Sequence, residues 1–304
     1  MKKNILICLE RLDIGGVETS VMNQALEYKR RSYNITIMAQ KGTYTKALEK
    51  NGIECIDYEF TLEDKLFIDK EKYIKNILDE RNITEVHIHQ YPCILHLLPV
   101  LLKYNIPYVA FVHSIVEGTY EWFMKIYKTY NLAFPLYFQN ARKIVTIREK
   151  EFDYNAELFN IKDKSKYFLL KNSIDFNQLP KIEDYPSKIN NYLLISRISE
   201  EKLLSIEKGI EFFLNLKNKN KKLSIVGDGK ELDYLKEKYQ DEKIEFLGKT
   251  NKVFDVMSKY DAVIGVDRCI LEAICCKKLA IISSYEGILE IVNSENIDYL
   301  SKSV

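Results

Sequence analysis

Residues 4–18 read NILICLERLDIGGVE: an apolar run, a polar turn that ends in Gly15 and Gly16, and the start of an amphipathic segment. The apolar run has the composition of a buried strand, and residues 17–28 carry one apolar stripe with the period of a helix. Adjacent glycines let the backbone approach a ligand closely, and the N-terminus of the following helix favours an anionic group. The stretch therefore predicts a strand, a tight turn and a helix, although a double glycine alone could be no more than a turn.

The alternation of strand and helix continues along the chain. Strands are predicted at residues 4–9, 35–39, 53–56, 86–88, 108–112, 144–147, 167–170, 192–195, 223–226, 244–246, 262–265 and 279–282. Amphipathic segments such as residues 71–78 lie between them. This alternation predicts an α/β protein with parallel sheets that helices cover on both faces.

The length and one polar segment predict two domains. A chain of 304 residues is long enough for two ordinary hydrophobic cores. Residues 172–190 contain Pro180 and Pro186, several charges and no apolar period, which is typical of a linker. We therefore expect one domain over residues 1–175 and a second over residues 176–304.

The composition argues against several classes of protein. Lys and Arg number 45 against 44 Asp and Glu, so no net field is available to grip nucleic acid or an anionic membrane. The six cysteines lack the two-residue spacing of a zinc or redox motif, which favours a reduced setting. No apolar run reaches the ~20 residues of a membrane span, and the first run is too short for a signal peptide. We expect a cytoplasmic protein, held at most at the inner face of the cell membrane, that does not bind nucleic acid.

A basic pair follows the first strand of the second half. Parallel α/β sheets bind ligands at the carboxyl ends of their strands. Arg197 and Lys202 come directly after residues 192–195 and can converge on a diphosphate, Arg as a planar fork and Lys as a mobile point charge. The alternative is a solvated loop in which these cations pair with Glu200 and Glu201.

Glycines also follow the next two strands, in Val-Gly-Asp-Gly at residues 226–229 and in Phe-Leu-Gly at residues 246–248. Leu-Glu-Ala at residues 271–273 comes after the strand at residues 262–265. The fingerprint G-x-G-x-x-G is absent, and the second strand ends without the acidic residue that would hold a ribose. A nicotinamide enzyme is therefore disfavoured.

This ordered series resembles the family 4 glycosyltransferases, retaining nucleotide-sugar enzymes of the GT-B fold. Such enzymes open with a strand, a Gly-Gly turn and a helix, matched here by Gly15 and Gly16. A strand that ends in a histidine is matched by residues 107–113, and an Asn-Gly-Ile-Asp-like hinge by residues 172–175. The Gly-Arg-x4-Lys pattern is matched by residues 196–202. The resemblance covers nearly the whole chain and implies two Rossmann-like domains that face each other across a cleft.

The resemblance also implies a role for each matched residue. Arg197 and Lys202 would neutralise the diphosphate of the donor, and Glu272 would hold the nucleotide ribose. His113 would stabilise charge on the sugar, whereas the alternative is a satisfied strand-end histidine. The residues expected to bind the donor are Gly15, Gly16, Arg197, Lys202, Gly227, Gly229, Gly248, Arg268, Leu271 and Glu272. The expected catalytic residues are His113, Arg197 and Lys202.

The implied activity is transfer of a sugar from a UDP- or GDP-sugar to a glycan or lipid-linked acceptor, with retention and without a metal or cofactor. The first domain would bind the acceptor and the second the donor, in the assembly of a bacterial surface polysaccharide or glycolipid. Two alternatives stay open: a catalytically silent nucleotide-binding homologue that serves as a partner subunit, and a nucleotide-sugar epimerase of the same fold.

Two features depart from the family pattern. Most members carry a second glutamate eight positions before the Leu-Glu-Ala one, and Ile264 stands there in this chain. Asp267 and Arg268 resemble a Gly-Arg element of some polysaccharide-assembly relatives. GT-B enzymes also continue with another strand and further helices beyond the point where this chain stops, at Val304, so we expect an incomplete second domain.

Two clusters of side chains have competing explanations. His87, His89, His96 and His113 lie close in sequence, but no cysteine or carboxylate set completes a recognisable ligand spacing, so no metal is expected. Residues 120–138 concentrate aromatic side chains with a few lysines. Such a segment could contact a membrane interface or a lipid-linked acceptor, and a helix packed on the sheet would have much the same composition.

Overall fold

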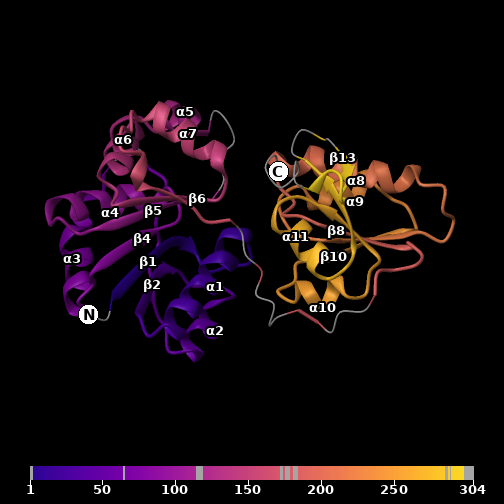
Figure 1. Cartoon of the computed structure of the whole chain (residues 1–304), viewed down its shortest axis with the longest axis horizontal. Helices are drawn as coiled ribbons and strands as arrows, with labels where there is room; N and C mark the ends of the chain where they lie inside the picture. Colours follow the sequence, from indigo (N-terminus) through magenta and orange to yellow (C-terminus); the bar gives the residue numbers. More distant parts are fainter. Residues whose placement is uncertain are drawn as a thin grey trace. The chain divides into compact units, whose positions relative to one another are not determined.

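The computed structural model describes residues 3–63, 66–113, 119–171, 174, 179–180, 184–284, 287 and 289–297. The chain divides into two compact units, Met1–Ser173 and Ile174–Val304 (Figure 1). Each unit has its own sheet of mainly parallel strands, with helices packed against it. The predicted α/β class, with two Rossmann-like sheets, is confirmed.

The first unit is built on a seven-stranded sheet in the order β3-β2-β1-β4-β5-β6-β7, and every neighbouring pair runs parallel. Its strands are β1 (Asn4–Arg11), β2 (Asn34–Gln40), β3 (Glu54–Asp57), β4 (Glu85–Ile88), β5 (Tyr108–Val112), β6 (Lys143–Thr146) and β7 (Tyr167–Leu169). Its α-helices are α1 (Gly16–Arg30), α2 (Thr45–Lys50), α3 (Glu71–Glu80), α4 (Pro92–Lys103), α5 (Thr119–Ile126), α6 (Tyr130–Asn140) and α7 (Glu149–Leu158). Short 3-10 turns lie at Ile68–Lys70 and Lys164–Lys166. The strand order reverses between β1 and β4, which is where such sheets bind ligands.

Alternate side chains of β1 fill the two faces of this sheet. Ile5, Ile7 and Leu9 belong to a core cluster with residues of α1 and α2, whereas Leu6 and Cys8 belong to a larger cluster with residues of α3, α4 and α6. Figure 1 shows α1 and α2 on one side of the central strands and α3 and α4 on the other. β1 is therefore buried on both faces, which explains its unbroken apolar run.

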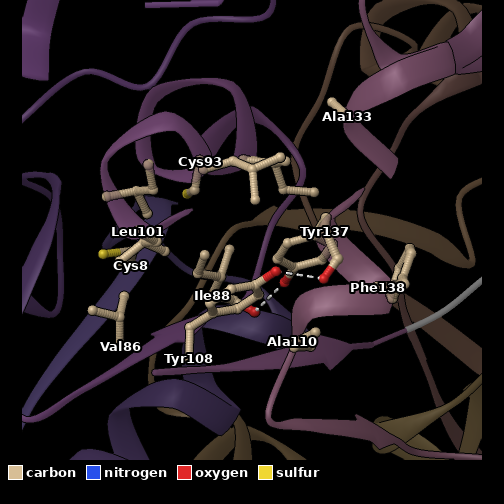
Figure 2. Close-up of a cluster of buried hydrophobic side chains, with 14 of the residues drawn as sticks. Cys8, Val86, Ile88, Cys93, Leu101, Tyr108, Ala110, Ala133, Tyr137 and Phe138 are labelled. Atoms are coloured by element: carbon tan, nitrogen blue, oxygen red, sulfur yellow. Dashed lines mark hydrogen bonds between the residues drawn. The ribbon is translucent and has the colours of Figure 1, made fainter. Parts of the chain in front are cut away.

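Tyr108 of β5 and Tyr137 of α6 lie against each other at the centre of the larger cluster, with ring centroids 5.4 Å apart (Figure 2). Tyr108 Oη donates to the backbone oxygen of Tyr137 at 2.6 Å, and Tyr137 Oη donates to the backbone oxygen of Ile88 at 3.5 Å. A buried phenol that keeps a hydrogen-bond partner avoids the cost of an unsatisfied polar group. These bonds hold α6 against β4 and β5.

The aromatic segment predicted at residues 120–138 forms α5 and α6. Most of its aromatic side chains are buried, including Tyr120, Tyr130, Phe134, Tyr137 and Phe138. Trp122, Ile126 and Leu132 are 54%, 50% and 60% exposed. The segment thus packs on the sheet along one side and leaves a small apolar surface on the other. None of the helices in the described residues has the length and apolar character of a membrane span.

The second unit is built on a six-stranded sheet in the order β10-β9-β8-β11-β12-β13. Its strands are β8 (Asn191–Ile195), β9 (Lys222–Val226), β10 (Ile244–Gly248), β11 (Ala262–Gly265), β12 (Leu279–Ser283) and β13 (Leu289–Ile291). Its helices are α8 (Leu203–Asn215), α9 (Leu232–Lys238), α10 (Val253–Met257) and α11 (Arg268–Cys275), and a 3-10 turn at Glu200–Lys202 precedes α8. All strand pairs are parallel except β12 with β13. The sequence did not predict β13, a strand of three residues.

A buried lysine closes the C-terminus of α8. Lys221 is 6% exposed, and its Nζ donates to the backbone oxygens of Phe213, Leu214 and Leu216 at 2.6, 2.6 and 2.7 Å. The last carbonyls of a helix have no partner within the helix and carry partial negative charge, so a cation there satisfies both needs. Lys221 therefore fixes the connection from α8 to β9.

Candidate functional site

The loops after β8, β9 and β10 are joined at the carboxyl edge of the second sheet. Ser196 N donates to Val226 O at 3.1 Å, and Gly227 N donates to Gly248 O at 3.0 Å. In the same loops, Ile198 N donates to Asp228 O at 2.9 Å. The structure thus brings together Arg197, Gly227, Gly229 and Gly248, which come from three separate motifs of the sequence.

Gly227 and Gly229 lie where a side chain cannot fit. A Cβ atom at Gly227 would overlap the backbone oxygen of Ser196, and one at Gly229 would overlap that of Ile198. Because the obstacle in each case is backbone, it cannot move aside as a flexible side chain would. Glycine is therefore required here for the loops after β8 and β9 to pack backbone against backbone.

Arg197 is a solvent-facing cation at this edge. Its Nη2 lies 2.5 Å from Glu201 Oε1, and the two side chains are 69% and 59% exposed. The pairing that the sequence offered as an alternative is therefore present. An ion pair this exposed contributes at most about 1 kcal/mol, so the anionic oxygens of a ligand can replace Glu201 at low cost.

Lys202 approaches the turn between β11 and α11. Lys202 is partly buried. Burial raises the pKa of the Cys269 thiol, and the positive charge of Lys202 acts in the opposite direction. Cys269 Sγ in turn lies 3.0 Å from Val266 O. Lys202 therefore lies on the side of the edge nearer to α11.

Arg268 and Glu272 form an ion pair within α11. Arg268 Nε lies 2.8 Å from Glu272 Oε1, and the side chains are only 13% and 9% exposed. Burial raises the pKa of Glu272, although Arg268 acts in the opposite direction. The neighbouring Leu271 is partly exposed, at 37%. The carboxylate that was predicted to hold a ribose is thus oriented by a partner one turn earlier in the helix.

Asp267, which the sequence did not single out as a site residue, has an unusual backbone. Its φ of 56° and ψ of −129° lie outside the regions that side chains with a Cβ normally occupy, and it caps the N-terminus of α11. Strained residues of this kind cluster at functional sites, because the surrounding structure must hold them in place. In the sequence, the one indication of this position was the resemblance of Asp267 and Arg268 to the Gly-Arg element of some relatives.

Ile264 belongs to the core. It is fully buried in the middle of β11, paired with Leu194 of β8 and Ile281 of β12. Gly209 of α8 lies directly against it, since a Cβ there would be 2.9 Å from Ile264 Cγ2. The Ile264 side chain therefore packs beneath α8, away from the carboxyl edge. Most family members are expected to carry a second glutamate at this position.

In the first unit, the turn after β1 is covered by a carboxylate. Gly15 is the N-cap of α1, and a Cβ at Gly15 would overlap Oε2 of Glu18. Gln90 Nε2 donates to Glu18 Oε1 at 3.1 Å. The helix N-terminus formed by Gly15 and Gly16 already holds a negative group of the chain itself, so an anionic ligand would have to displace Glu18. In the second unit, α9 begins only at Leu232, so Gly229 is not its N-cap.

His113 lies just beyond the carboxyl end of β5 and is bonded to a second histidine. His89 Nδ1 and His113 Nε2 are 2.7 Å apart, and the ring of His89 is stacked on Phe111 with centroids 4.2 Å apart. Burial lowers the pKa of His113 to about 4. His113 is therefore a neutral imidazole at pH 7, able to form hydrogen bonds but not to supply a positive charge.

The remaining histidines have protein partners. His87 Nε2 lies 3.1 Å from Glu85 Oε1, and His96 Nδ1 lies 2.9 Å from Tyr58 Oη. Across the part of the chain that the structure describes, no three His, Cys, Asp or Glu side chains are grouped to hold a metal ion. Three residues of the predicted hinge, Asn172, Ser173 and Asp175, lie outside the described residues.

Sequence comparison decides the family. The profile named Glycosyltransferase Family 4 matches residues 14–178, which is more than half of the chain. The chain belongs to glycosyltransferase family 4. It is thus a glycosyltransferase by family, as its motifs predicted. No curated protein matches it in sequence.

Solved structures agree with this family 4 glycosyltransferase in fold. Anabaena HepE in complex with UDP and glucose is 17% identical with a TM-score of 0.71, over 92% of this chain and 80% of HepE. A glycosyltransferase from Rickettsia africae is 18% identical with a TM-score of 0.66, over 94% and 80% of the two chains. WaaG, a glycosyltransferase involved in lipopolysaccharide biosynthesis, is 15% identical with a TM-score of 0.67, over 93% and 82%. The predicted GT-B fold is confirmed.

Proposed function

We propose that this family 4 glycosyltransferase binds a nucleotide diphosphate sugar on its second domain, residues 176–304, and an acceptor on its first domain, residues 1–175. The observation that carries the proposal is the carboxyl edge of the second sheet. Two cations, Arg197 and Lys202, lie there beside backbone that only glycine allows and beside the carboxylate of Glu272. Cations bind a diphosphate, and a carboxylate accepts hydrogen bonds from ribose hydroxyls.

The proposed reaction breaks the bond between the anomeric carbon of the sugar and the diphosphate oxygen, which keeps the pair of electrons. A hydroxyl oxygen of the acceptor forms the new bond to that carbon, and its proton passes to the departing diphosphate. Arg197 and Lys202 offset the negative charge that builds there, which is electrostatic stabilisation of the transition state. Glu272 accepts a hydrogen bond from a ribose hydroxyl, in the orientation that Arg268 imposes. His113 acts on the sugar as a neutral hydrogen-bonding group. The product keeps the anomeric configuration of the donor.

A UDP-sugar is the donor to test first. Anabaena HepE is described in complexes with UDP, with UDP and glucose, and with UDP-glucose. The shared fold supports the comparison, and a GDP-sugar is the second donor to test.

The proposed acceptor is a glycan or a lipid-linked saccharide in the assembly of a bacterial surface polysaccharide or glycolipid. WaaG, of similar fold, is involved in lipopolysaccharide biosynthesis. The exposed Trp122, Ile126 and Leu132 offer an apolar surface next to the exposed Lys125 and Lys128. Apolar side chains flanked by cations suit the lipid part of such an acceptor at the inner face of the membrane.

A transfer assay tests the proposal. The chain is incubated with UDP-glucose and other nucleotide sugars, UDP or GDP release is measured, and NMR of the product gives its anomeric configuration. Arg197→Ala and Lys202→Ala should each lower kcat by about 10²-fold, the lower end of the loss for one stabilising group. The matched control is Arg31→Ala, since Arg31 is 68% exposed and pairs with Glu27 one helical turn away. Nucleotide binding without any sugar release would instead support the catalytically silent homologue.

A further inference from the structure

The bond between His89 and His113 contains a single hydrogen. Both nitrogens, His89 Nδ1 and His113 Nε2, belong to imidazole rings, and at 2.7 Å one must donate and the other accept. Either His89 carries its proton on Nδ1 and donates to His113, or His113 carries its proton on Nε2 and donates to His89. In the first arrangement the second nitrogen of His89 is an acceptor and that of His113 is a donor. In the second arrangement these roles are exchanged.

The burial of His89 favours one arrangement. His89 is 4% exposed, and its second nitrogen, Nε2, is a buried atom without a hydrogen-bond partner in the described part of the chain. If His113 donated, this Nε2 would carry a buried N–H group with no acceptor. If His89 donates, Nε2 keeps only a lone pair. Buried N–H groups without a partner are rarer than buried acceptors without one, so His89 is the donor.

The other two histidines of β4 and α4 follow the same rule. His87 Nε2 faces the carboxylate of Glu85 at 3.1 Å and must carry a proton, and the buried His87 Nδ1 is the atom left without a partner. His96 Nε2 accepts from Thr61 N at 3.3 Å, so the proton of neutral His96 is on Nδ1, which donates to Tyr58 Oη. Each ring therefore carries its proton on the nitrogen that faces an acceptor.

We propose that His89 is a positioning residue that fixes His113 in the tautomer with its proton on Nδ1. With Nε2 occupied as an acceptor, neutral His113 has only Nδ1–H left for a ligand. His113 makes no other side-chain hydrogen bond to the described residues, and it is partly exposed, whereas His89 is buried. The ligand atom that it recognises is therefore an acceptor, a hydroxyl or phosphate oxygen, and His113 does not act as a base. This inference rests on the proposed function for the identity of the ligand, the sugar donor.

The geometry around the pair keeps both rings in place. The His89 ring packs against Phe111, with 4.2 Å between centroids and 13° between planes, and meets the ring of His113 through their hydrogen bond, with 5.0 Å between centroids and 29° between planes. His89 follows β4, and His113 follows β5. His87 of β4 is paired with Val109 of β5, and two residues further along these strands the same register brings His89 beside Phe111. Besides His113, the titratable neighbour that acts on the pKa of His89 is His87. The ring of His89 is thus packed against Phe111 while its Nδ1 is directed at His113 Nε2.

NMR of the whole chain labelled with ¹⁵N in its histidine rings tests the inference without any assay of transfer. At pH 8 the two-bond coupling patterns distinguish Nδ1–H from Nε2–H, with His96 as the internal reference for the first and His87 for the second. His113 should show a protonated Nδ1 and an unprotonated Nε2. A protonated Nε2 on His113 overturns the inference, even if the proposed function is correct.

Two variants test whether His89 imposes that state. His89→Phe keeps a ring but removes the donor, so His113 should lose its preference for Nδ1–H. His89→Asn keeps an N–H donor near the position of Nδ1 and should retain it. Unchanged signals of His87 and His96 establish that each variant is folded. An unchanged His113 tautomer in folded His89→Phe overturns the positioning role.

Enzyme kinetics give a second, independent readout. His89→Phe should lower kcat by about tenfold, in the range typical for loss of an orienting partner, and His89→Asn should recover most of it. A variant with unchanged kcat and an altered His113 tautomer would contradict the use of His113 Nδ1 in the reaction. If no transfer occurs in the wild-type chain, the proposed function fails while the tautomer measurement still decides the inference.

Discussion

Arg268 donates from Nε to Glu272 Oε1 at 2.8 Å, one turn apart in α11, and both side chains are largely shut off from water. Desolvating two charges is costly, and a pair of this kind repays the cost only when its geometry is good. The pair therefore serves to hold the Glu272 carboxylate in one orientation at the edge of the sheet. If Glu272 contacts a ribose, Arg268 determines where its oxygens lie.

Removing the partner of Glu272 should destabilise the second unit. Arg268→Met leaves a buried carboxylate alone, and the free energy of unfolding should fall by about 3 kcal/mol, as measured by urea unfolding. Lys208→Met is the control, because Lys208 and Glu211 form an exposed pair on α8 and their loss should cost less than about 1 kcal/mol. Equal effects of the two variants would show that the Arg268–Glu272 pair has no special role.

The backbone of Asp267 should favour glycine over alanine. Asp267→Gly and Asp267→Ala both remove the carboxylate, but only glycine adopts a φ of 56° without strain. The glycine variant should be more stable than the alanine variant by about 1 kcal/mol, as measured by thermal unfolding. A more stable alanine variant would mean that the strain at Asp267 is absent in solution.

The capping of α8 by Lys221 should contribute measurably to stability. Lys221→Met keeps much of the apolar stem but leaves the three carbonyls at the end of α8 without their donor. The expected loss is about 2 kcal/mol, since hydrogen bonds with a charged partner are among the stronger ones. Lys222→Met, at the exposed neighbouring position, should change stability little. Similar losses in both variants would contradict the capping role.

Acid should destabilise the first unit in two stages. Burial lowers the pKa of His96 and of His113 to about 4, below the ordinary value of 6.5. The unfolded chain therefore binds more protons than the folded one between pH 6.5 and 4, and stability falls as the pH falls through this window. A hydrogen bond from His87 lowers the pKa of Glu85 from 4.5 to about 2, so its contribution, present above pH 4.5, is lost between pH 4.5 and 2.

Urea unfolding at a series of pH values separates these stages. His96→Phe should reduce the dependence of stability on pH between 6.5 and 4, whereas Glu85→Gln should alter it only below pH 4.5. The His96 assignment is wrong if His96→Phe has the same slope as the wild type in the upper window.

The sequence predicted nearly every strand of the fold, because buried parallel strands are apolar runs bounded by turns. Residues 4–9 and 108–112, for example, form β1 and β5. β13 was missed, since Leu289–Ile291 is too short to show a period and pairs antiparallel with β12. Its place in the sheet depends on contacts with β12 that no local pattern reveals.

The candidate site was predicted in part. Motif order predicted that Arg197, Lys202 and Glu272 bind the donor, because ligands bind after strand ends, and these roles stay predictions. It did not locate the Glu18 carboxylate over Gly15 or the strained Asp267, since side-chain and backbone conformations are not encoded in a short pattern. The His89–His113 bond depends on the register of β4 against β5, which only the structure supplies.

The carboxyl edge of the second sheet is proposed to bind the diphosphate of a nucleotide sugar. Thermal unfolding of the wild-type chain with UDP, GDP and UDP-glucose tests this binding most directly. A nucleotide at about a hundred times its Kd should add ~2.7 kcal/mol to the stability of the wild type and of Arg31→Ala. Arg197→Ala and Lys202→Ala should lose most of this gain. Absence of stabilisation by every nucleotide, or an equal gain in all four proteins, would contradict binding of the diphosphate at this edge.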